Sequence, residues 1–381
     1  MTPKTFMIIA GEPSGDLLAA ELVSSLCDAT ATKPMFFGAG GTKMSEAGVE
    51  LTFDLTQHAV TGITDVLKSY FKFRRLFNQL LTMAIERKPD VVIGVDFGGF
   101  NLRFGHAVKE YVRKHPGSGW NPKIVQLVSP QVWASRPGRA NLLAADYDLL
   151  LSIFPFEKDW YARRVPKLRV EFVGHPMLDR LARPKSQDSK PKATSPTILL
   201  LPGSRKSELQ RHLPVLLPAI RLIREKLPDA KAKIVLPNER LAALAKSLGV
   251  DFDIQLGNLP EALAQADVAI ASTGTVTMEC AFFGVPTVTL YKTSWLTFEI
   301  GKRIVTVKSL TMPNLMANEE VYPEFIQDTA TAENIANAAL DLLQDESRRQ
   351  KIRVQLDKII ASLGEPGAAS RAAAAIMSLF K

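Results

Sequence analysis

Residues 271–286 read ASTGTVTMECAFFGVP and follow a short apolar run, 267–270, that we interpret as a buried strand. Small and hydroxyl residues at 272–275 then lead into a helix predicted from about 276 to 283. Gly284 and Pro286 end this helix before the next strand, at 287–291. A strand that ends in a small-residue turn at a helix N-terminus presents free backbone N–H groups at the positive end of the helix dipole, which suits a phosphate group.

Glu279 lies about one helical turn inside this predicted helix. A carboxylate at such a place could accept two hydrogen bonds from the hydroxyl groups of a ribose, as acidic residues do in other doubly wound nucleotide sites. The alternative is a helix capped by serine and threonine that carries a surface glutamate. The local sequence leaves both interpretations open.

The bulk composition limits the class of protein. A chain of 381 residues fits two domains, and its two cysteines, Cys27 and Cys280, form neither a disulfide framework nor a metal pattern. No signal peptide opens the chain and no apolar run approaches the roughly 20 residues of a membrane span, so we expect a cytoplasmic protein. A net charge of +8 suits an anionic partner, either a phosphorylated substrate or acidic lipid. Nucleic acid ranks last, because no motif of basic residues with interleaved aromatics is present.

Strand-then-helix order runs through both halves of the chain. This order predicts an α/β protein with two doubly wound parallel-sheet (Rossmann-like) domains that face each other across a cleft. The stretch KSQDSKPKATSP loses apolar periodicity and is typical of a linker. We therefore expect domains at 1–180 and 197–345, a linker at 181–196, and C-terminal helices at 346–381 that pack on the first domain or on a partner chain.

Asp96 ends a strongly apolar strand predicted at 90–95. Ligands of open α/β sheets bind beyond the carboxyl ends of the strands, so Asp96 faces the expected binding crevice. Its carboxylate either caps the next helix or takes a proton from an attacking hydroxyl group.

A helical stripe of apolar residues recurs every three or four positions over residues 60–85. Aromatic and basic side chains gather in its middle, and they suggest a surface that lies on anionic lipid: Tyr70, Phe71, Phe73, Arg74 and Arg75. The alternative is a core helix with a solvated cationic face.

Seven blocks in collinear order give the chain a resemblance to the lipid-A-disaccharide synthases, which are inverting, metal-independent glycosyltransferases of the two-Rossmann GT-B architecture. They are AGEPSGDLLAA, FGAGGTKM, PDVVIGVDFGGFN, LVSPQVWAS, LPGSRKSE, ASTGTVTMECAFFGVP and SLTMPNLMANEEVYPEFIQ. The resemblance covers essentially the whole chain. It implies transfer of 2,3-diacylglucosamine from its UDP conjugate to 2,3-diacylglucosamine 1-phosphate, which gives UDP and the β-1,6-linked disaccharide of lipid A.

The resemblance also assigns roles to residues. The family's essential aspartate falls on Asp96, and the turn of AGEPSGD is placed on the acceptor side through Glu12, Ser14, Gly15 and Asp16. The UDP-sugar side comprises Gly203, Ser204, Arg205, Gly274, Thr275, Glu279, Asn314 and Gln327. No cofactor or metal is expected. The expected partners are the two acylated sugars and the cytoplasmic face of the inner membrane, to which the protein would bind peripherally, and a homodimer is left open.

Two other classes of function compete with this interpretation. Another transferase of the UDP-N-acetylglucosamine type, or a UDP-N-acetylglucosamine 2-epimerase, would share the architecture and the donor chemistry. A non-catalytic protein that binds nucleotide sugar or lipid would keep the fold without needing Asp96 or Arg205. A nicotinamide-dependent dehydrogenase is disfavoured, because GxGxxG occurs in neither half.

Overall fold

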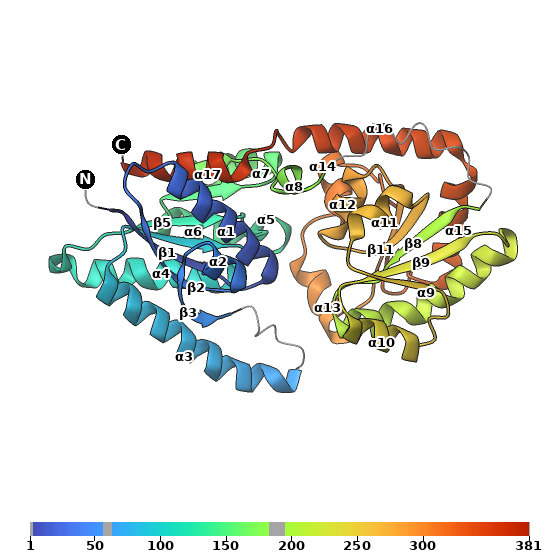
Figure 1. Ribbon diagram of the computed structural model, residues 1–381, viewed down its shortest axis with the longest axis horizontal. Coiled ribbons are helices and arrows are strands. Elements are labelled where there is room, and N and C mark those ends of the chain that lie inside the picture. The colour runs from blue at the N-terminus through green and yellow to red at the C-terminus, as the bar shows by residue number, and fades with distance from the viewer. Residues whose placement is uncertain (1–2, 56–62, 183–194, 381) are drawn as a thin grey trace. The chain divides into compact units, whose positions relative to one another are not determined.

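A computed structural model of the chain describes residues 3–55, 63–182 and 195–380, and in the helix that begins at residue 63 it describes side chains from residue 73 onward. The chain forms two compact units. The first combines Met1–Asp179 with Leu363–Lys381, and the second is Arg180–Ser362. Each unit is built on one parallel sheet (Figure 1).

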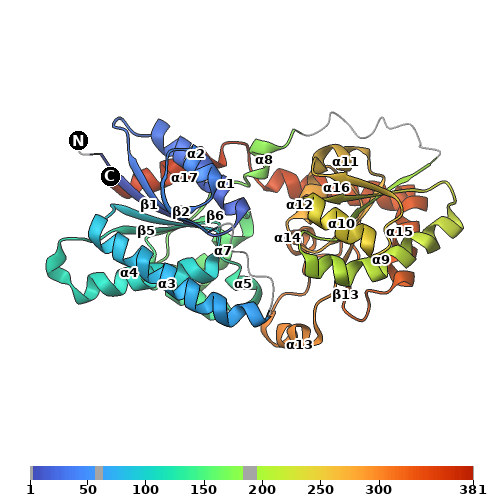
Figure 2. The same cartoon turned by 60° about the horizontal axis from the view of Figure 1, so that its bottom comes forward.

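The sheet of the first unit has the strand order β3-β2-β1-β4-β5-β6-β7. Its strands are β1 (Thr5–Ala10), β2 (Met35–Gly40), β3 (Glu50–Asp54), β4 (Val91–Val95), β5 (Lys123–Leu127), β6 (Leu149–Ser152) and β7 (Val170–Phe172). Its helices are α1 (Pro13–Asp28), α2 (Thr42–Glu46), α3 (Ile63–Arg87), α4 (Gly98–Lys114), α5 (Val132–Ser135), α6 (Ala140–Asp146), α7 (Pro155–Arg164), α8 (Met177–Arg180) and α17 (Ala368–Met377). Helices α1, α2 and α17 cover one face of the sheet, and α3 and α4 cover the other (Figure 2).

The sheet of the second unit has the order β10-β9-β8-β11-β12-β13. Its strands are β8 (Thr197–Leu201), β9 (Lys231–Leu236), β10 (Asp253–Leu256), β11 (Val268–Ser272), β12 (Thr287–Tyr291) and β13 (Glu324–Ile326). Its helices are α9 (Lys206–Lys226), α10 (Glu239–Ser247), α11 (Leu259–Gln265), α12 (Val276–Phe282), α13 (Trp295–Ile304), α14 (Met312–Ala317), α15 (Ala332–Gln344) and α16 (Glu346–Ser362).

Burial on both faces explains why the central strands are almost wholly apolar. In β4, VVIGV, every residue is buried, and in β11, VAIAS, the same holds. Helices on both sides of a parallel sheet remove each face from water, so alternation of apolar and polar residues gives way to continuous apolar runs.

The strand orders fix where a ligand can bind. In the first sheet β1 lies beside both β2 and β4, and in the second sheet β8 lies beside both β9 and β11. The chain therefore changes direction between β1 and β4, and again between β8 and β11. Such a switch point opens a crevice at the carboxyl ends of its two strands. The turns that follow these four strands are the ones that carry most of the residues singled out above.

The last helix returns to the first unit. Helix α17 packs along α1. Arg371 donates from Nε to the backbone carbonyl of Val173 over 2.7 Å, and the backbone N–H of His175 donates to the carbonyl of Leu363 over 3.1 Å. Helix α16 packs on α12, α14 and α15 and belongs to the second unit.

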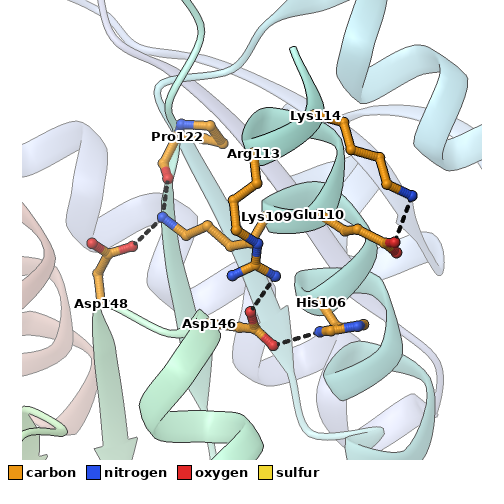
Figure 3. Close-up of polar contacts among 8 residues, drawn as sticks. All are labelled: His106, Lys109, Glu110, Arg113, Lys114, Pro122, Asp146 and Asp148. Atoms are coloured by element: carbon orange, nitrogen blue, oxygen red, sulfur yellow. Dashed lines mark hydrogen bonds and ion pairs between the residues drawn. The ribbon is translucent and has the colours of Figure 1, made fainter. Parts of the chain in front are cut away.

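Helix α4 carries ion pairs of two kinds (Figure 3). Asp146 at the end of α6 has a side chain only 2% exposed, and it accepts from His106 over 2.7 Å and from Arg113 over 3.1 Å. Glu110 and Lys114 pair over 2.7 Å on the outer surface, where their side chains are 48% and 66% exposed. The buried acceptor joins two helices, whereas the exposed pair lies within one.

We expect the replacement Asp146→Ala to lower the free energy of unfolding of the first unit by about 1–3 kcal/mol, because two donors lose a desolvated acceptor. Glu110→Ala on the same helix is the matched control, and we expect less than about 0.5 kcal/mol from it because the pair is solvated. Urea denaturation followed by circular dichroism measures both. Equal losses for the two variants would contradict this assignment.

Candidate functional site

The turn after β1 carries the residues predicted for the acceptor side. Glu12 and Ser14 are exposed, whereas Gly15 is buried. A Cβ atom at Gly15 would lie 3.3 Å from the carbonyl oxygen of Val95 and 3.5 Å from Cβ of Asp96. The first turn of α1 therefore packs directly against the end of β4, and glycine permits this approach.

Asp16 follows this turn and, unlike the exposed Glu12 and Ser14, has a buried side chain. Its side chain accepts from the backbone N–H groups of Gly41, Lys43 and Met44 over 2.8, 2.9 and 3.1 Å, and the residue is 4% exposed. It thus caps the first turn of α2 from a neighbouring helix, which suits a carboxylate near a helix N-terminus. Its carboxylate is occupied inside the protein, so we assign Asp16 a positioning role.

Asp96 lies at the carboxyl end of β4 in an unusual backbone conformation. Its φ is +51° and that of Phe97 is +46°, so two successive non-glycine residues are left-handed. The backbone N–H of Asp96 donates to the carbonyl of Leu127 over 2.9 Å. Its carbonyl accepts from Asn101 Nδ2 over 2.8 Å and from Gln126 Nε2 over 2.9 Å. Residues in such a conformation cost about 1–3 kcal/mol each and persist only where the surroundings hold them.

Asn101 and Gln126 are functional candidates that the sequence interpretation missed. Both are buried, at 2% and 0% exposure, and a Cβ atom at Gly94 would lie 2.8 Å from Asn101 Cβ and 2.5 Å from Gln126 Oε1. Glycine at position 94 therefore makes room for the two amide groups that hold Asp96. A glutamine within the apolar strand IVQL was the available signal, because a buried polar side chain needs a partner.

Burial is the main cause that raises the pKa of the Asp96 carboxyl group, and the charge of Glu12 raises it further. A hydrogen bond from the backbone of Phe97 opposes these two effects. Glu12 comes from the turn after β1 and Asp96 from the end of β4, so the switch point brings their charges close. A carboxyl group with a raised pKa is a stronger base once it is deprotonated.

Three arginines gather beside this edge of the first sheet without a carboxylate partner among the described residues. They are Arg103 on α4, and Arg136 and Arg139 after α5. Burial lowers the pKa of Arg139, and the charges of Arg136 and Arg103 lower it further. By contrast, Lys109, further along α4, pairs with Asp148 over 3.0 Å (Figure 3). Positive charge is thus left uncompensated near the end of α4 that follows Asp96.

The turn after β8 carries Gly203, Ser204 and Arg205. Gly203 has φ of +115°, and a Cβ there would clash with Glu208. The Glu208 carboxylate accepts from the backbone N–H groups of Ser204 and Arg205 over 2.8 and 3.1 Å. The Arg205 side chain is 67% exposed, and its guanidinium lies 3.7 Å from that carboxylate. The backbone of this turn is therefore fixed while most of the cationic head remains open to an anion.

His212 lies beneath this turn and was not singled out by the sequence. It is fully buried, and its Nε2 accepts from the backbone N–H of Lys292 over 3.1 Å, which leaves Nδ1 to donate to the carbonyl of Pro202 over 2.6 Å. Burial lowers its pKa, in keeping with the neutral ring that these two bonds require. His212 thus ties the turn after β8 to the end of β12.

The turn after β11 holds Gly274, Thr275 and Glu279. Gly274 has φ of +144° and open space where a Cβ would lie, and Thr275 is exposed. The carbonyl of Gly274 accepts from the hydroxyl group of Thr277 over 2.7 Å. Burial raises the pKa of Glu279, and its carboxyl group has no hydrogen bond or ion pair with any residue in the part of the chain that is described. A half-buried acceptor with unused capacity is what a ribose site requires.

The two remaining predicted donor residues act inside the protein. All four hydrogen-bonding positions of the buried Asn314 amide are occupied: Oδ1 accepts from the N–H groups of Val321 and Tyr322, and Nδ2 donates to the Tyr322 carbonyl and to Glu324. Gln327 bonds both backbone groups of Thr293, over 3.1 and 3.2 Å. We therefore assign both side chains to positioning of the loops around β13: the Asn314 amide has no unused position, and the Gln327 amide fixes the backbone of Thr293 through one donor and one acceptor.

The predicted lipid surface is described only in part. The side chains of Tyr70 and Phe71 lie outside the described residues. Phe73 is partly buried, with its ring 6.4 Å from that of Phe97, and Arg74 and Arg75 are exposed. This section of α3 therefore lies next to the residue that follows Asp96.

The described residues lack two kinds of feature. No group of three or more His, Cys, Asp or Glu side chains among them is arranged to hold a metal ion. No helix in the described ranges is long and apolar enough to cross a membrane.

Comparison with known proteins identifies the relatives of this chain. The family model for lipid-A-disaccharide synthetase matches residues 6–378. The lipid-A-disaccharide synthase of Trichlorobacter lovleyi is 36% identical over 99% of this chain and 98% of its own length. That of Myxococcus xanthus is 32% identical over 99% and 98%. The lipid-A-disaccharide synthase 1 of Legionella pneumophila (strain Philadelphia 1) is 34% identical over 94% and 92%.

Solved structures share the fold at low sequence identity. A putative UDP-N-acetylglucosamine 2-epimerase from Listeria monocytogenes superimposes with a TM-score of 0.61 at 16% identity, covering 100% of this chain and 97% of that one. The calicheamicin glycosyltransferase gives 0.60 at 15% identity, covering 99% and 98%. These likenesses and the two parallel sheets confirm the predicted fold class, a pair of Rossmann-like units of GT-B type. The length and identity of the sequence matches show that the chain belongs to the lipid-A-disaccharide synthetase family of glycosyltransferases.

Proposed function

We propose that this protein transfers 2,3-diacylglucosamine from its UDP conjugate to the 6-hydroxyl group of 2,3-diacylglucosamine 1-phosphate. The products are UDP and a β-1,6-linked disaccharide. The observation that carries the proposal is Asp96, whose backbone carbonyl is held by two buried amides at the switch point of the first sheet in a chain of this family.

In this reaction Asp96 acts as the general base. It removes the proton of the acceptor 6-hydroxyl while that oxygen attacks C1 of the donor sugar. The bond between C1 and the UDP oxygen breaks on the opposite face, so the configuration at C1 inverts in one displacement. The raised pKa of Asp96 supports this role, because a base is more effective when its pKa approaches the working pH.

The second unit supplies the donor side. As the bond to C1 breaks, negative charge grows on the diphosphate, and Arg205 together with the backbone N–H groups near Gly203, Ser204, Gly274 and Thr275 would stabilise it. Glu279 would accept the ribose hydroxyl groups, which fits its unused carboxylate. A solved UDP-GlcNAc 2-epimerase from Neisseria meningitidis, with this fold at a TM-score of 0.59, is bound to UDP-GlcNAc.

The first unit would hold the acceptor through Glu12, Ser14 and Gly15, with the uncompensated Arg103, Arg136 and Arg139 available to its phosphate. Acyl chains on both sugars call for a protein that works at the cytoplasmic face of the inner membrane, and the aromatic and basic residues of α3 suit such a surface. The charges of these arginines, with that of Arg205, let the reaction proceed without a metal or other cofactor.

Turnover of the two acylated sugars in the presence of EDTA tests the proposed reaction. We expect disaccharide and UDP in equal amounts from the wild type. Asp96→Asn should lower kcat by about 10²–10⁴, the usual contribution of a general base. Asp159→Asn, on the exposed side of α7, is the matched control and should leave kcat unchanged. Folded wild-type protein that forms no disaccharide but converts UDP-N-acetylglucosamine to its 2-epimer would contradict the proposal.

The pH dependence of kcat/KM tests the environment of Asp96. Only the deprotonated carboxylate accepts a proton, so activity should fall as the pH drops through the raised pKa of Asp96. Glu12→Gln removes a negative charge that raises this pKa, so the acid limb should move to lower pH. Glu21→Gln, later on α1, is the control. An acid limb that stays in place in Glu12→Gln would show that another group controls it.

A further inference from the structure

Helix α13 of the second unit has no buried residue along its length. The exposed fractions are 72% for Trp295, 59% for Leu296 and 49% for Ile300, and Val305, directly after the helix, is 38% exposed. Helices of globular proteins ordinarily bury an apolar stripe against a core. In α13, by contrast, Trp295, Leu296 and Ile300 are exposed to solvent, and Phe298 and Ile304 are only partly buried.

The concentration of these side chains is unusual within this chain. Eight large apolar residues of the described chain are exposed, and four of them lie within residues 295–305. The other four, Met35, Leu142, Leu256 and Val354, are scattered over separate elements. Single exposed apolar residues are normal on a protein surface, whereas a contiguous group marks a binding surface.

Positive charge accompanies the apolar group. Arg303 and Lys308 are exposed and form no ion pair with a residue in the described ranges. Lys302 lies 5.3 Å from the centre of the Phe298 ring and 3.8 Å from the Glu299 carboxylate. By helical spacing, Arg303 neighbours Ile300, three positions earlier, and lies two turns from Leu296 on the same face, so apolar and cationic side chains share one face.

The N-terminal end of α13 is fixed to the second sheet by hydrogen bonds. The hydroxyl group of Ser294 caps the helix by accepting from the N–H of Thr297 over 3.3 Å. Just before it, Lys292 donates from Nζ to the carbonyl of Gln327 over 2.7 Å, and its backbone N–H donates to His212. His212 also bonds the carbonyl of Pro202. The segment that leads into α13 is therefore linked to the turn that carries Arg205, at the carboxyl ends of β8 and β12.

We propose that α13 and Val305 form a second lipid-binding surface, which lies in the headgroup region of an anionic phospholipid bilayer. Trp295, Leu296 and Ile300 enter the boundary between headgroups and acyl chains, where tryptophan is enriched. Arg303 and Lys308 pair with the negative headgroups. The charge favours this occupant over a purely apolar partner. The proposal adds the second unit to the lipid association that was inferred from α3.

Vesicle co-sedimentation of the full chain tests the proposal, with vesicles of neutral phosphatidylcholine alone or with one third anionic phosphatidylglycerol. We expect binding to the anionic vesicles that weakens as salt is raised. Replacing three apolar residues should weaken it at least about tenfold, in the variant Trp295→Ser/Leu296→Ser/Ile300→Ser. The matched control removes the same number of exposed apolar side chains elsewhere and should bind as the wild type does: Leu142→Ser/Leu256→Ser/Val354→Ser.

Two further readouts separate lipid from other occupants. The charge variant Arg303→Gln/Lys308→Gln should weaken binding to the anionic vesicles by about fivefold for each charge and leave binding to neutral vesicles unchanged. The emission of Trp295, taken as the difference between wild type and Trp295→Phe, should shift to shorter wavelength when anionic vesicles are added.

Unchanged vesicle binding by the triple apolar variant would overturn the proposal. If that variant instead converted a dimer to a monomer in sedimentation velocity, α13 would be an interface between two copies of the chain. Neither result bears on the proposed reaction if its turnover is measured with the acylated sugars dispersed in detergent, where no bilayer is present. A failure of lipid binding therefore leaves the transferase assay to be judged by itself.

Discussion

Two side-chain amides hold the backbone carbonyl of Asp96, and the candidate chemistry of the first unit depends on this contact. Asn101 and Gln126 donate to that carbonyl over 2.8 and 2.9 Å, while two successive residues adopt left-handed conformations. Without these donors the strained turn has less to hold it, and the carboxylate has no fixed place beyond β4. Gly94 is part of the same arrangement, because any Cβ there would displace both amides. The conformational cost is thus met by buried hydrogen bonds that a loop on the surface could not provide.

The second unit uses the same kind of construction for its turns. Glu208 fixes the backbone after β8, His212 ties that turn to the end of β12, and Gln327 holds Thr293. In each case a side chain forms hydrogen bonds with backbone groups. The backbone of the turn is therefore fixed, and an exposed group such as the Arg205 guanidinium remains open to a ligand. Asp16 and Asn314 belong to this supporting class, although the family pattern places them among the binding residues.

The sequence predicted the features that follow from periodicity and from turn chemistry. Apolar runs such as VVIGV located the strands, and the small residues at 272–275 located the turn after β11, where Gly274 has a φ of +144°. The order of strands and helices placed Asp96 at the carboxyl end of a strand, where the structure has it.

The sequence pattern could not reveal which polar residues form hydrogen bonds with one another across the fold. Asn101, Gln126 and His212 act through partners 5 to 80 positions away, and a single sequence carries no trace of those pairings. The exposure of α13 could not be predicted for a related reason, because WLTFEIGKRI has the composition of a helix that packs on a core.

A double-mutant cycle between Asp96 and Gln126 tests most directly whether the amide clamp, the hydrogen bonds from Asn101 and Gln126 to the Asp96 carbonyl, affects catalysis through the Asp96 carboxylate. Gln126→Met keeps the volume of the side chain and removes its donor, and kcat for disaccharide formation is measured for both single variants and for the double variant. If the clamp serves only to place Asp96, Gln126→Met should lower kcat in the wild type and have no further effect in Asp96→Asn. Losses that multiply in the double variant, with thermal unfolding unchanged, would show that Gln126 acts independently of Asp96 and would contradict this account.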